Sequence, residues 1–234
     1  MRAIIFANGT FTDAQQARDL LHADDVVIAV DGGTRHAWGA GVDPQLVIGD
    51  LDSLTEEEQE RLRSSGAEIS SFSPHKDRTD LELALLHAAS QGVDEIVILA
   101  ALGGRLDQTI ANLLLLTLPD LEGCHTRIVQ GAQTAFVIRD GALIEGQPGD
   151  TVSLIPLGGD AIGVTAEGME WPLDDDTLRF GPARGVSNVL RAEQASVRVR
   201  RGLLLCVVTH RLPDAKGGET DATEGEMSVR EDVR

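Results

Sequence analysis

A short apolar strand followed at once by two carboxylates is predicted at Leu46-Val47-Ile48-Gly49-Asp50-Leu51-Asp52-Ser53. Alternate side chains of an extended chain point to the same face, so Asp50 and Asp52 can present both carboxylates to one cation. Magnesium suits such a pair, because it takes few protein carboxylates and completes its shell with phosphate oxygens and water. The simpler alternative is that either aspartate only caps a helix that begins after Ser53.

Strands and helices alternate on both sides of this segment. Buried strands are also expected at Ala3–Ala7, Val26–Val30 and Ile96–Ala100, and helices at Asp13–Ala23, Glu56–Ser64, Leu81–Ser90 and Gln108–Leu118. Thr55-x-x-Glu58 and Thr79-x-x-Glu82 match the capping-box pattern at two of the helix starts. Such alternation implies parallel strands joined by helical crossovers, so residues 1–120 are predicted to form a Rossmann-like α/β domain with a mostly parallel sheet.

The pattern changes after Pro119. Short β-like runs separated by Gly, Pro and Asp turns lie at Thr126–Val129, Thr134–Arg139, Thr151–Pro156, Ala161–Ala166, Ser196–Arg201 and Leu203–Thr209. They predict an antiparallel β-sandwich or barrel over residues 124–212, with the domain boundary in Pro119–Gly123. Residues 213–234 are polar and nearly free of large apolar side chains, so they are expected to form a disordered acidic tail.

The charge balance limits the kinds of partner. The chain has 38 acidic and 20 basic residues and a formal net charge of -18, which would repel nucleic acid and an anionic membrane surface. No run approaches the ~18 apolar residues of a membrane span, and the apolar start is too short for a signal peptide, so a cytoplasmic location is expected. Cys124 and Cys206 have no Cys or His close by in sequence, which argues against a disulfide framework or a zinc site.

Carboxylates also stand beside other predicted strand ends and helix starts. Asp31 follows Val30 and precedes two glycines, Asp80 stands at a helix start, and Asp107 closes Gly103-Gly104-Arg105-Leu106-Asp107. Ligands of such folds bind in the crevice outside the carboxyl ends of the strands, so these aspartates are expected to converge there with Asp50 and Asp52. Convergence favours the metal interpretation of the Asp-x-Asp pair over helix capping.

Groups that would neutralise phosphate accompany the carboxylates. Lys76 and Arg105 lie within the same motifs, and the helix start at Thr79-Asp80 offers unpaired backbone N–H groups. Neither a Walker phosphate loop nor a Gly-x-Gly-x-x-Gly fingerprint occurs, so phosphates must be bound in another way. The α/β half is therefore predicted to use aspartates and magnesium in an enzyme that transfers a phosphoryl-type group.

Six motifs occur in a fixed order along the chain. They are Asp31-Gly32-Gly33, Gly49-Asp50-Leu51-Asp52-Ser53, Lys76-Asp77-Arg78-Thr79-Asp80-Leu81-Glu82-Leu83-Ala84, Gly103-Gly104-Arg105-Leu106-Asp107-Gln108-Thr109-Ile110-Ala111-Asn112, Gly168-Met169-Glu170-Trp171-Pro172-Leu173 and Gly185-Val186-Ser187-Asn188. Together they resemble the thiamine pyrophosphokinase family from about Ile4 to Val208. The resemblance implies transfer of the pyrophosphoryl group of ATP to thiamine, giving thiamine diphosphate and AMP. It also implies Mg²⁺ and a homodimer whose thiamine sites lie between subunits.

The resemblance assigns a role to each motif. It implies that the catalytic carboxylates are Asp50, Asp52, Asp80 and Asp107, that Asp50, Asp52 and Asp80 bind magnesium, and that the ATP site includes Asp31, Gly32, Gly33, Lys76, Thr79, Arg105, Gln108 and Asn112. Either Asp80 or Asp107 would accept the proton of the thiamine hydroxyl. Trp171 would stack on the pyrimidine, and Ser187 and Asn188 would hydrogen-bond its edge.

Alternatives stay open at this point. Trp171 is equally compatible with the core of the sandwich, Ser187 and Asn188 with an ordinary β-turn, and Trp38 is assigned to helix packing. Asp50-x-Asp52 also resembles the motif of haloacid-dehalogenase-type phosphatases, but that motif follows the first strand of its domain and here it follows about the third. A non-catalytic sensor would bind Mg·ATP and release no product.

Overall fold

The computed structural model describes residues 1–70 and 77–211. The α/β half contains β1 (Arg2–Phe6), α1 (Ala14–Leu20), β2 (Val26–Val30), α2 (Gly33–Gly39), β3 (Leu46–Ile48), α3 (Glu56–Ser65), β4 (Glu68–Ser70), α4 (Asp80–Ser90), β5 (Glu95–Leu99) and α5 (Leu106–Leu115). After the 3-10 turn η1 (Pro119–Leu121) come β6 (His125–Gln130), β7 (Gln133–Ile138), β8 (Gly141–Glu145), β9 (Thr151–Glu167), β10 (Leu173–Leu178), β11 (Asn188–Val189), β12 (Gln194–Arg198) and β13 (Arg201–Thr209).

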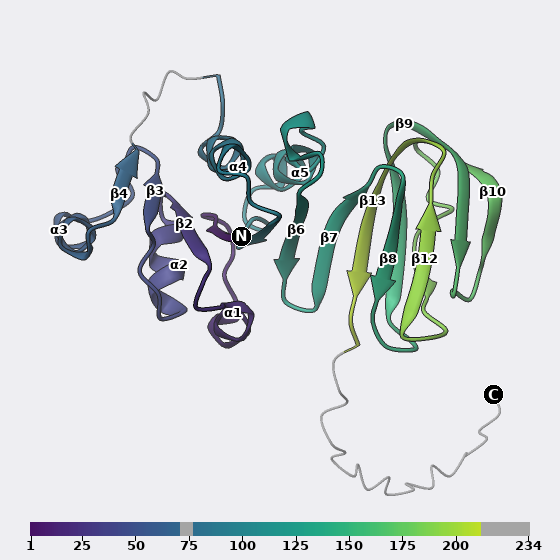
Figure 1. Ribbon diagram of the computed structural model, residues 1–234, viewed down its shortest axis with the longest axis horizontal. Helices are drawn as coiled ribbons and strands as arrows, with labels where there is room; N and C mark the ends of the chain where they lie inside the picture. Colours follow the sequence, from purple (N-terminus) through teal and green to yellow (C-terminus); the bar gives the residue numbers. More distant parts are fainter. Residues whose placement is uncertain (71–76, 212–234) are drawn as a thin grey trace, which may run out of the picture.

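One sheet runs through both halves of the molecule. The first part has the order β4-β3-β2-β1-β5-β6 with all neighbours parallel, and the second continues as β7-β13-β9-β12-β8 with all neighbours antiparallel. Figure 1 shows the α/β part and the antiparallel part side by side, joined by the β6–β7 hairpin. The α/β fold with a mostly parallel sheet and later antiparallel strands is confirmed.

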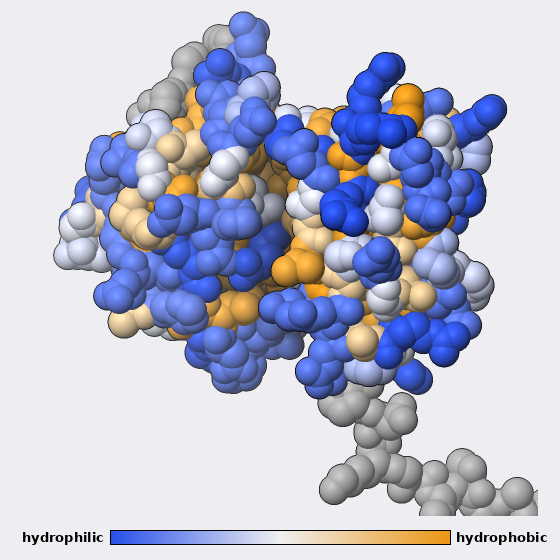
Figure 2. All heavy atoms as spheres, turned by 45° about the vertical axis from the view of Figure 1, so that its right-hand side comes forward, coloured by the Kyte–Doolittle hydropathy of each residue, from blue (hydrophilic) through white to orange (hydrophobic). Residues whose placement is uncertain are grey.

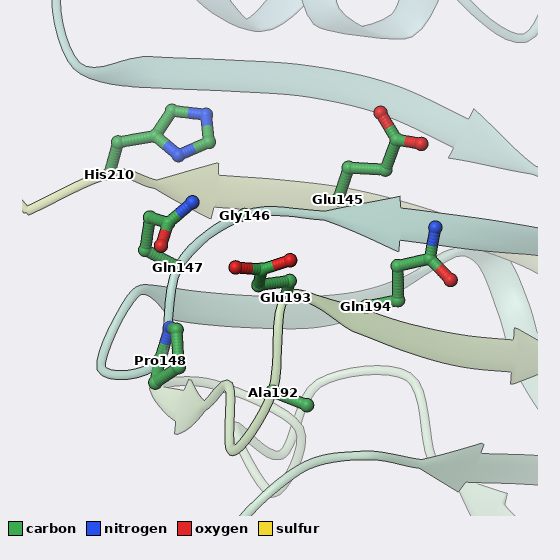
Figure 3. A pocket seen from close by; sticks show the side chains of 8 residues that line it. All are labelled: Glu145, Gly146, Gln147, Pro148, Ala192, Glu193, Gln194 and His210. Carbon is green, nitrogen blue, oxygen red and sulfur yellow. The ribbon is translucent and has the colours of Figure 1, made fainter.

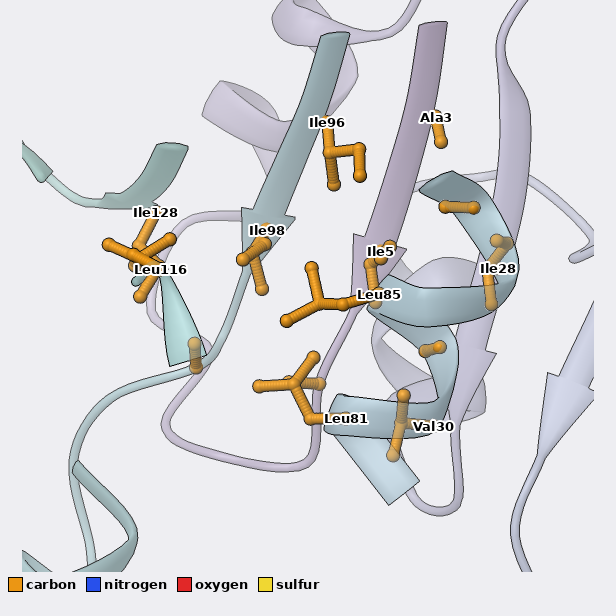
Figure 4. Packing of buried hydrophobic residues seen from close by; sticks show 14 of the residues in the cluster. Ala3, Ile5, Ile28, Val30, Leu81, Leu85, Ile96, Ile98, Leu116 and Ile128 are labelled. Carbon is orange, nitrogen blue, oxygen red and sulfur yellow. The ribbon is translucent and has the colours of Figure 1, made fainter. Parts of the chain in front are cut away.

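Both faces of the parallel sheet are covered, which explains why its strands read as unbroken apolar runs. Ile5 of β1, Ile28 of β2 and Ile98 of β5 pack against Leu81 and Leu85 of α4 on one face (Figure 4). The alternate side chains Ile4, Phe6, Val27, Val97 and Leu99 form a second cluster with Ala17 of α1 and Ala37 of α2. The antiparallel strands enclose a core of their own around Val152, Leu154, Val164 and Leu204.

Most of the expected elements are present with small shifts. The strands Val26–Val30 and Leu46–Ile48 have the bounds expected, while the helix expected at Gln108–Leu118 begins at Leu106 and ends at Leu115. The capping box is complete at Thr55 and Glu58. At α4 the Thr79 side chain accepts from the Glu82 amide, but the Glu82 carboxylate pairs with Arg78, so in this described helix only the N-cap half of the box forms.

Several expectations about the second half are corrected. The two strands expected at Thr151–Pro156 and Ala161–Ala166 are one strand, β9. Gly158 and Gly163 adopt positive φ and bend this strand at irregularities opposite β13 and β10, respectively, without ending it. α2, β4, β8, β10 and β11 were not expected. The β6 strand extends the parallel sheet past the expected boundary at Pro119–Gly123, and the division at that point stays a prediction.

Two further expectations concern the tail and membrane-spanning segments. The tail expected at 213–234 lies outside the described residues. None of the helices in residues 1–70 and 77–211 is long and apolar enough to cross a membrane.

Candidate active site

A cavity of about 660 Å³ opens at the carboxyl ends of the central strands. It is lined by residues at or just after the ends of β1, β2 and β5 and by residues of α4 and α5 and the segments just before them, namely Ala7, Asn8, Gly9, Thr10, Val30, Asp31, Thr79, Asp80, Leu81, Ala101, Gly103, Gly104, Arg105, Gln108 and Asn112. The chain proceeds from β1 to β2, β3 and β4 on one side and returns to β5 on the other. The cavity therefore sits at the point where the strand order reverses, as expected for a ligand site of this fold.

Four carboxylates come together beside this cavity. Burial, followed by the charge of Asp80 and then by the charges of Asp50 and Asp52, raises the pKa of Asp31 to about 7. The pKa of Asp52 is also raised, chiefly because its carboxyl shares a hydrogen bond with Asp50 and lies near that charge. The convergence expected from sequence is thus present for Asp31, Asp50, Asp52 and Asp80.

The backbone around these carboxylates is tightly constrained. Asp31 has φ 45° and Leu51 has φ 61°, both in the left-handed region that side chains rarely adopt. A Cβ at Gly49 would lie 1.6 Å from Asp31 Oδ1, so only glycine lets the two strand ends approach. The N-cap of α3 is Thr55, which overturns the alternative in which Asp50 or Asp52 caps that helix.

The donor chemistry of the cluster fits a hard cation. Its side chains offer only carboxylate oxygens, and Asp31 Oδ1 is buried without a hydrogen-bond partner among the described residues. In residues 1–70 and 77–211, no group of three or more His, Cys, Asp or Glu side chains is arranged so that it could hold a metal ion by itself. An open arrangement of this kind is compatible with Mg²⁺, which commonly takes few protein ligands and completes its shell with phosphate and water.

Only some of the residues expected to bind ATP line the cavity. Arg105, Gln108 and Asn112 line the cavity, and Asn112 Nδ2 donates to the Ala101 carbonyl at 2.7 Å, which ties α5 to the end of β5. Asp107 does not line it, and its Oδ2 lies 2.5 Å from Arg105 Nη2 on the exposed surface. Lys76 lies outside the described residues.

Two glycines that were expected at the ATP site have packing roles instead of lining the cavity. A Cβ at Gly33 would meet the Phe6 carbonyl oxygen at 2.0 Å, and one at Gly32 would meet Asn8 Oδ1 at 2.3 Å. Glycine at both positions therefore lets α2 begin directly against β1 and the segment after it.

The expected thiamine residues lie in the antiparallel half. Trp171 is 60% exposed, which overturns the alternative that it fills the sandwich core. Asn188 is buried, its Oδ1 accepts from the Trp171 amide at 3.1 Å, and its Nδ2 donates to the Trp171 carbonyl at 2.7 Å. Ser187 precedes it with φ 64°. Asn188 thus holds the Trp171 backbone in place and presents the indole to solvent.

Comparison with known proteins follows the same division of the chain. The family model for "Thiamin pyrophosphokinase, catalytic domain" matches residues 17–128, and that for "Thiamin pyrophosphokinase, vitamin B1 binding domain" matches residues 142–204, together about three quarters of the sequence. The chain belongs to the thiamin pyrophosphokinase family. The first model spans the acidic cluster, and the second contains Trp171, Ser187 and Asn188.

Comparisons with individual proteins point to the same family. The thiamine pyrophosphokinase of Bacillus subtilis is 28% identical over 182 residues, which cover 77% of this chain and 85% of the relative. Thiamine pyrophosphokinase 1 of Arabidopsis thaliana is 29% identical, over 69% of this chain and 64% of its own. The crystal structure of the Bacillus subtilis protein has a TM-score of 0.82 at 26% identity and covers 91% of this chain and 100% of that one. The yeast thiamin pyrophosphokinase structure, at 17% identity and TM-score 0.71, shares the fold.

Membership of the thiamin pyrophosphokinase family supports ATP-dependent pyrophosphoryl transfer to thiamine, and neither the phosphatase nor the sensor alternative is favoured. Sequence reasoning nevertheless missed part of the cavity of this family member. Asn8, Gly9 and Thr10 follow β1 as Asp31 and Gly32 follow β2, and the Gly9 amide donates to the Ala100 carbonyl at 2.7 Å. The polar Asn-Gly step directly after the first apolar strand was the signal available in the sequence.

A larger and more open concavity of about 1200 Å³ lies at one end of the antiparallel half of this family member. Figure 3 shows Glu145, Gln147, Glu193 and His210 around it, and His210 Nδ1 lies 2.7 Å from Asp150 Oδ2. Asp150 is buried and also accepts from the backbone amides of Gln147 and Arg211, so it fixes the local turns. No site residue of the predicted set lies there, which leaves the smaller cavity as the candidate active site.

Proposed function

We propose that this chain transfers the pyrophosphoryl group of ATP to the hydroxyl of thiamine and releases thiamine diphosphate and AMP. The observation that carries the proposal is the meeting of Asp31, Asp50, Asp52 and Asp80 beside a cavity that also contains Arg105. Phosphate transfer makes few covalent demands on a protein, so positioning and charge neutralisation are the main requirements. The four carboxylates can bind a cation, and the guanidinium of Arg105 can bind phosphate oxygens. Together they meet the requirements for positioning and for charge neutralisation.

The proposed ligands of Mg²⁺ are Asp50, Asp52 and Asp80, with Asp31 completing the acidic cluster. When bound, Mg²⁺ would neutralise phosphate oxygens during an in-line displacement at the β-phosphate. The thiamine oxygen would form its bond to that phosphorus as the bond to the α,β-bridging oxygen breaks. Asp80, which lines the cavity, or Asp107, once Arg105 leaves it, would take the hydroxyl proton. Burial withdraws the Asp31 carboxylate from water, which would strengthen the interaction of this one member of the cluster with a cation.

The triphosphate would lie along the first turn of α5. Arg105 can hold phosphate oxygens with its guanidinium fork once it leaves Asp107, and Gln108 lies on the same side of the helix. Residues at the N-terminal ends of α4 and α5 line the cavity, and the N-terminal end of a helix favours an anionic ligand. Lys76 stays in the proposal as a further phosphate ligand.

Thiamine would bind through Trp171, Ser187 and Asn188 of a second copy of the chain. Within one chain, β5 and β9 are four strand spacings apart, a distance on the order of 19 Å across the sheet, which is too far for one small substrate to bridge. If a second copy of the chain placed its exposed Trp171 at the cavity, thiamine could contact the indole and the cavity at the same time. α5 supports the pairing, because Leu106, Ile110 and Leu114 form an exposed apolar stripe, 74%, 51% and 48% exposed, beside Gln108.

The arrangement of apolar and polar side chains on the surface is compatible with an interface near the junction of the α/β part and the antiparallel part. Figure 2 shows a mostly hydrophilic surface, with apolar side chains gathered along the furrow between the α/β part and the antiparallel part. A homodimer that covers such residues on both copies would remove them from water.

The decisive assay incubates the protein with Mg·ATP and thiamine and identifies both products. AMP and thiamine diphosphate in equal amounts are expected, with no AMP when thiamine is omitted. Release of inorganic phosphate without thiamine would point to the phosphatase, and binding of Mg·ATP without turnover would point to the sensor. Either result would overturn the proposal.

The shared site has its own test. Asp52→Asn and Trp171→Ala proteins are assayed separately and after mixing at equal amounts under conditions of subunit exchange, with thiamine kept low. If each site uses both copies, half of the dimers are mixed and each holds one intact site, so activity should recover to about a quarter of wild type. No recovery after demonstrated exchange would show that each chain carries a complete site.

We also propose that the protein works in the cytoplasm. Cys124 and Cys206 are both free thiols, and burial raises the pKa of Cys206 to about 12, so it is unreactive. Unpaired cysteines are usual where the compartment is reducing. Fractionation of the cells that make the protein tests the proposal, and recovery with the membrane or outside the cell would contradict it.

A further inference from the structure

A cluster of hydrogen bonds joins the acidic loop to α2 and α3 through residues that do not line the cavity. We propose that Arg35 is a positioning residue that clamps the loop Gly49–Leu54 to α3 and so fixes where the Asp50 and Asp52 carboxylates point. The proposal rests on the proposed function, in which these carboxylates bind the divalent cation. Arg35 does not line the cavity and lies on no motif that the sequence singled out.

The first part of the clamp is a two-pronged ion pair. Arg35 Nε lies 2.6 Å from Glu58 Oε1, and Arg35 Nη2 lies 2.6 Å from Glu58 Oε2. Arg35 Nη2 also donates to the Ser53 carbonyl at 2.7 Å. One guanidinium thus joins Ser53, the residue after the Asp-x-Asp motif, to the first turn of α3, and a planar fork is needed to make these contacts together.

Glu58 is itself fixed by the capping box. Its Oε2 accepts from the Thr55 amide at 2.8 Å, and its own amide donates to Thr55 Oγ1 at 3.3 Å. The bond from Arg35 is the main reason that the pKa of Glu58 falls to about 2, so the carboxylate stays charged at any pH where the enzyme works. The anchor of the clamp is therefore held by several hydrogen bonds and is ionised near neutral pH.

The segment held by the clamp needs such support. Leu51 adopts φ 61° between the two aspartates, a left-handed conformation that is unfavourable for residues with a side chain. Its carbonyl accepts from the Leu54 amide at 3.0 Å and from Gln59 Nε2 at 3.2 Å. Strained backbone persists where its surroundings over-determine it, and here bonds from α3 and Arg35 do so from two directions.

The same arginine links the two halves of the carboxylate cluster. It lies in α2, which begins two residues after Asp31, and its amide donates to the Gly32 carbonyl at 3.0 Å. A shift of the Ser53 end of the loop relative to α2 would change the spacing between Asp31 and Asp52. Arg35 therefore sets the separation of carboxylates that come from two different strands, while touching none of the reacting groups.

The test compares Arg35→Gln and Arg35→Lys with a matched control, Arg61→Gln. Arg61 is an exposed arginine on α3 that pairs with Asp43 and stacks on Trp38 without touching the loop. Two readouts besides activity are measured in the absence of substrates: Mn²⁺ affinity by electron paramagnetic resonance, and hydrogen exchange of the amides from Leu51 to Leu54. The side chain of Arg35 is half exposed, so its loss is compatible with folding.

We expect Arg35→Gln to weaken Mn²⁺ binding about 10-fold, the lower end of what groups that orient metal ligands contribute, and to speed exchange in the loop. Arg35→Lys should fall between Arg35→Gln and wild type, because a lysine keeps the charge but cannot form the fork. Arg61→Gln should leave both readouts unchanged. Unaltered loop exchange and Mn²⁺ affinity within twofold of wild type in Arg35→Gln would overturn the clamp.

Asp52→Asn separates this inference from the proposed function. If Asp52→Asn abolishes Mn²⁺ binding while Arg35→Gln changes nothing, the metal site stands and the clamp is wrong. If Asp52→Asn leaves Mn²⁺ binding intact, the metal assignment fails, and loop exchange in Arg35→Gln still decides whether the clamp exists.

Discussion

Gly49 offers the sharpest test of the packing around the acidic cluster. It has φ 148° and its missing Cβ would stand 1.6 Å from Asp31 Oδ1 and 2.5 Å from Asp31 Cγ. Gly49→Ala would therefore carry two costs: a backbone region almost confined to glycine, and displacement of the Asp31 carboxylate. Backbone strain of this kind costs ~1–3 kcal/mol and the displacement adds to it, so we expect a total of ~2–4 kcal/mol.

Gly66→Ala is the matched control. Gly66 ends α3 with φ 80°, and a Cβ added there would have no neighbouring atom within 4 Å. It should lose ~1 kcal/mol from backbone strain alone. A chain of this length loses roughly 2–4 °C of melting temperature per kcal/mol, so Gly66→Ala should melt a few degrees lower and Gly49→Ala about 5–15 °C lower.

Two measurements test the close approach of Gly49 to Asp31: the melting temperature by calorimetry, and the rate of AMP formation from Mg·ATP and thiamine. Gly66→Ala should keep its turnover, whereas Gly49→Ala should lose at least about 100-fold, because Asp31 leaves the carboxylate cluster. A Gly49→Ala protein that melts like Gly66→Ala and turns over at the wild-type rate would refute the close approach of these two strand ends.

Three other substitutions test separate parts of the structure. Asp52→Asn should lower turnover by orders of magnitude with little change in melting temperature, since it removes a proposed metal ligand on an exposed loop; near wild-type turnover with Mg²⁺ would refute that role. Trp171→Ala should raise the thiamine KM by the equivalent of ~1–2 kcal/mol and leave the ATP KM unchanged, and an equal rise in both would argue against stacking. Glu58→Gln should melt lower than wild type by a constant amount above pH 4.5. That difference should vanish as the pH falls toward 2, because the pKa of Glu58 is lowered by Arg35 and its contribution to stability is lost on protonation; a difference unchanged at pH 2 would contradict it.

The parts of the fold that follow from local pattern were predictable. Apolar runs between turn residues predict buried strands such as Val26–Val30, and the alternation of these strands with helices predicts a parallel sheet. The meeting of Asp31 with Asp50 and Asp52 followed from that topology, since neighbouring parallel strands end at the same edge.

What sequence reasoning missed depends on contacts between distant residues. α2 is seven residues long with glycine at both ends, and it exists because Gly33 packs against the Phe6 carbonyl. Arg35 and Glu58 are 23 residues apart and match no spacing rule. The exposure of Trp171 depends on Asn188 holding its backbone from another strand, so sequence alone could not separate a core tryptophan from a surface one.

The hairpin between β6 and β7 limits how this molecule can move. β7 is hydrogen-bonded to β6 along one edge and to β13 along the other, so main-chain bonds run without interruption from the parallel strands into the antiparallel ones. Opening the two parts as hinged bodies would require breaking this ladder. Substrate entry and release are therefore expected to depend on loop movement or, in the proposed homodimer, on sliding of one subunit against the other, and enclosure of the reacting groups would then depend on both subunits.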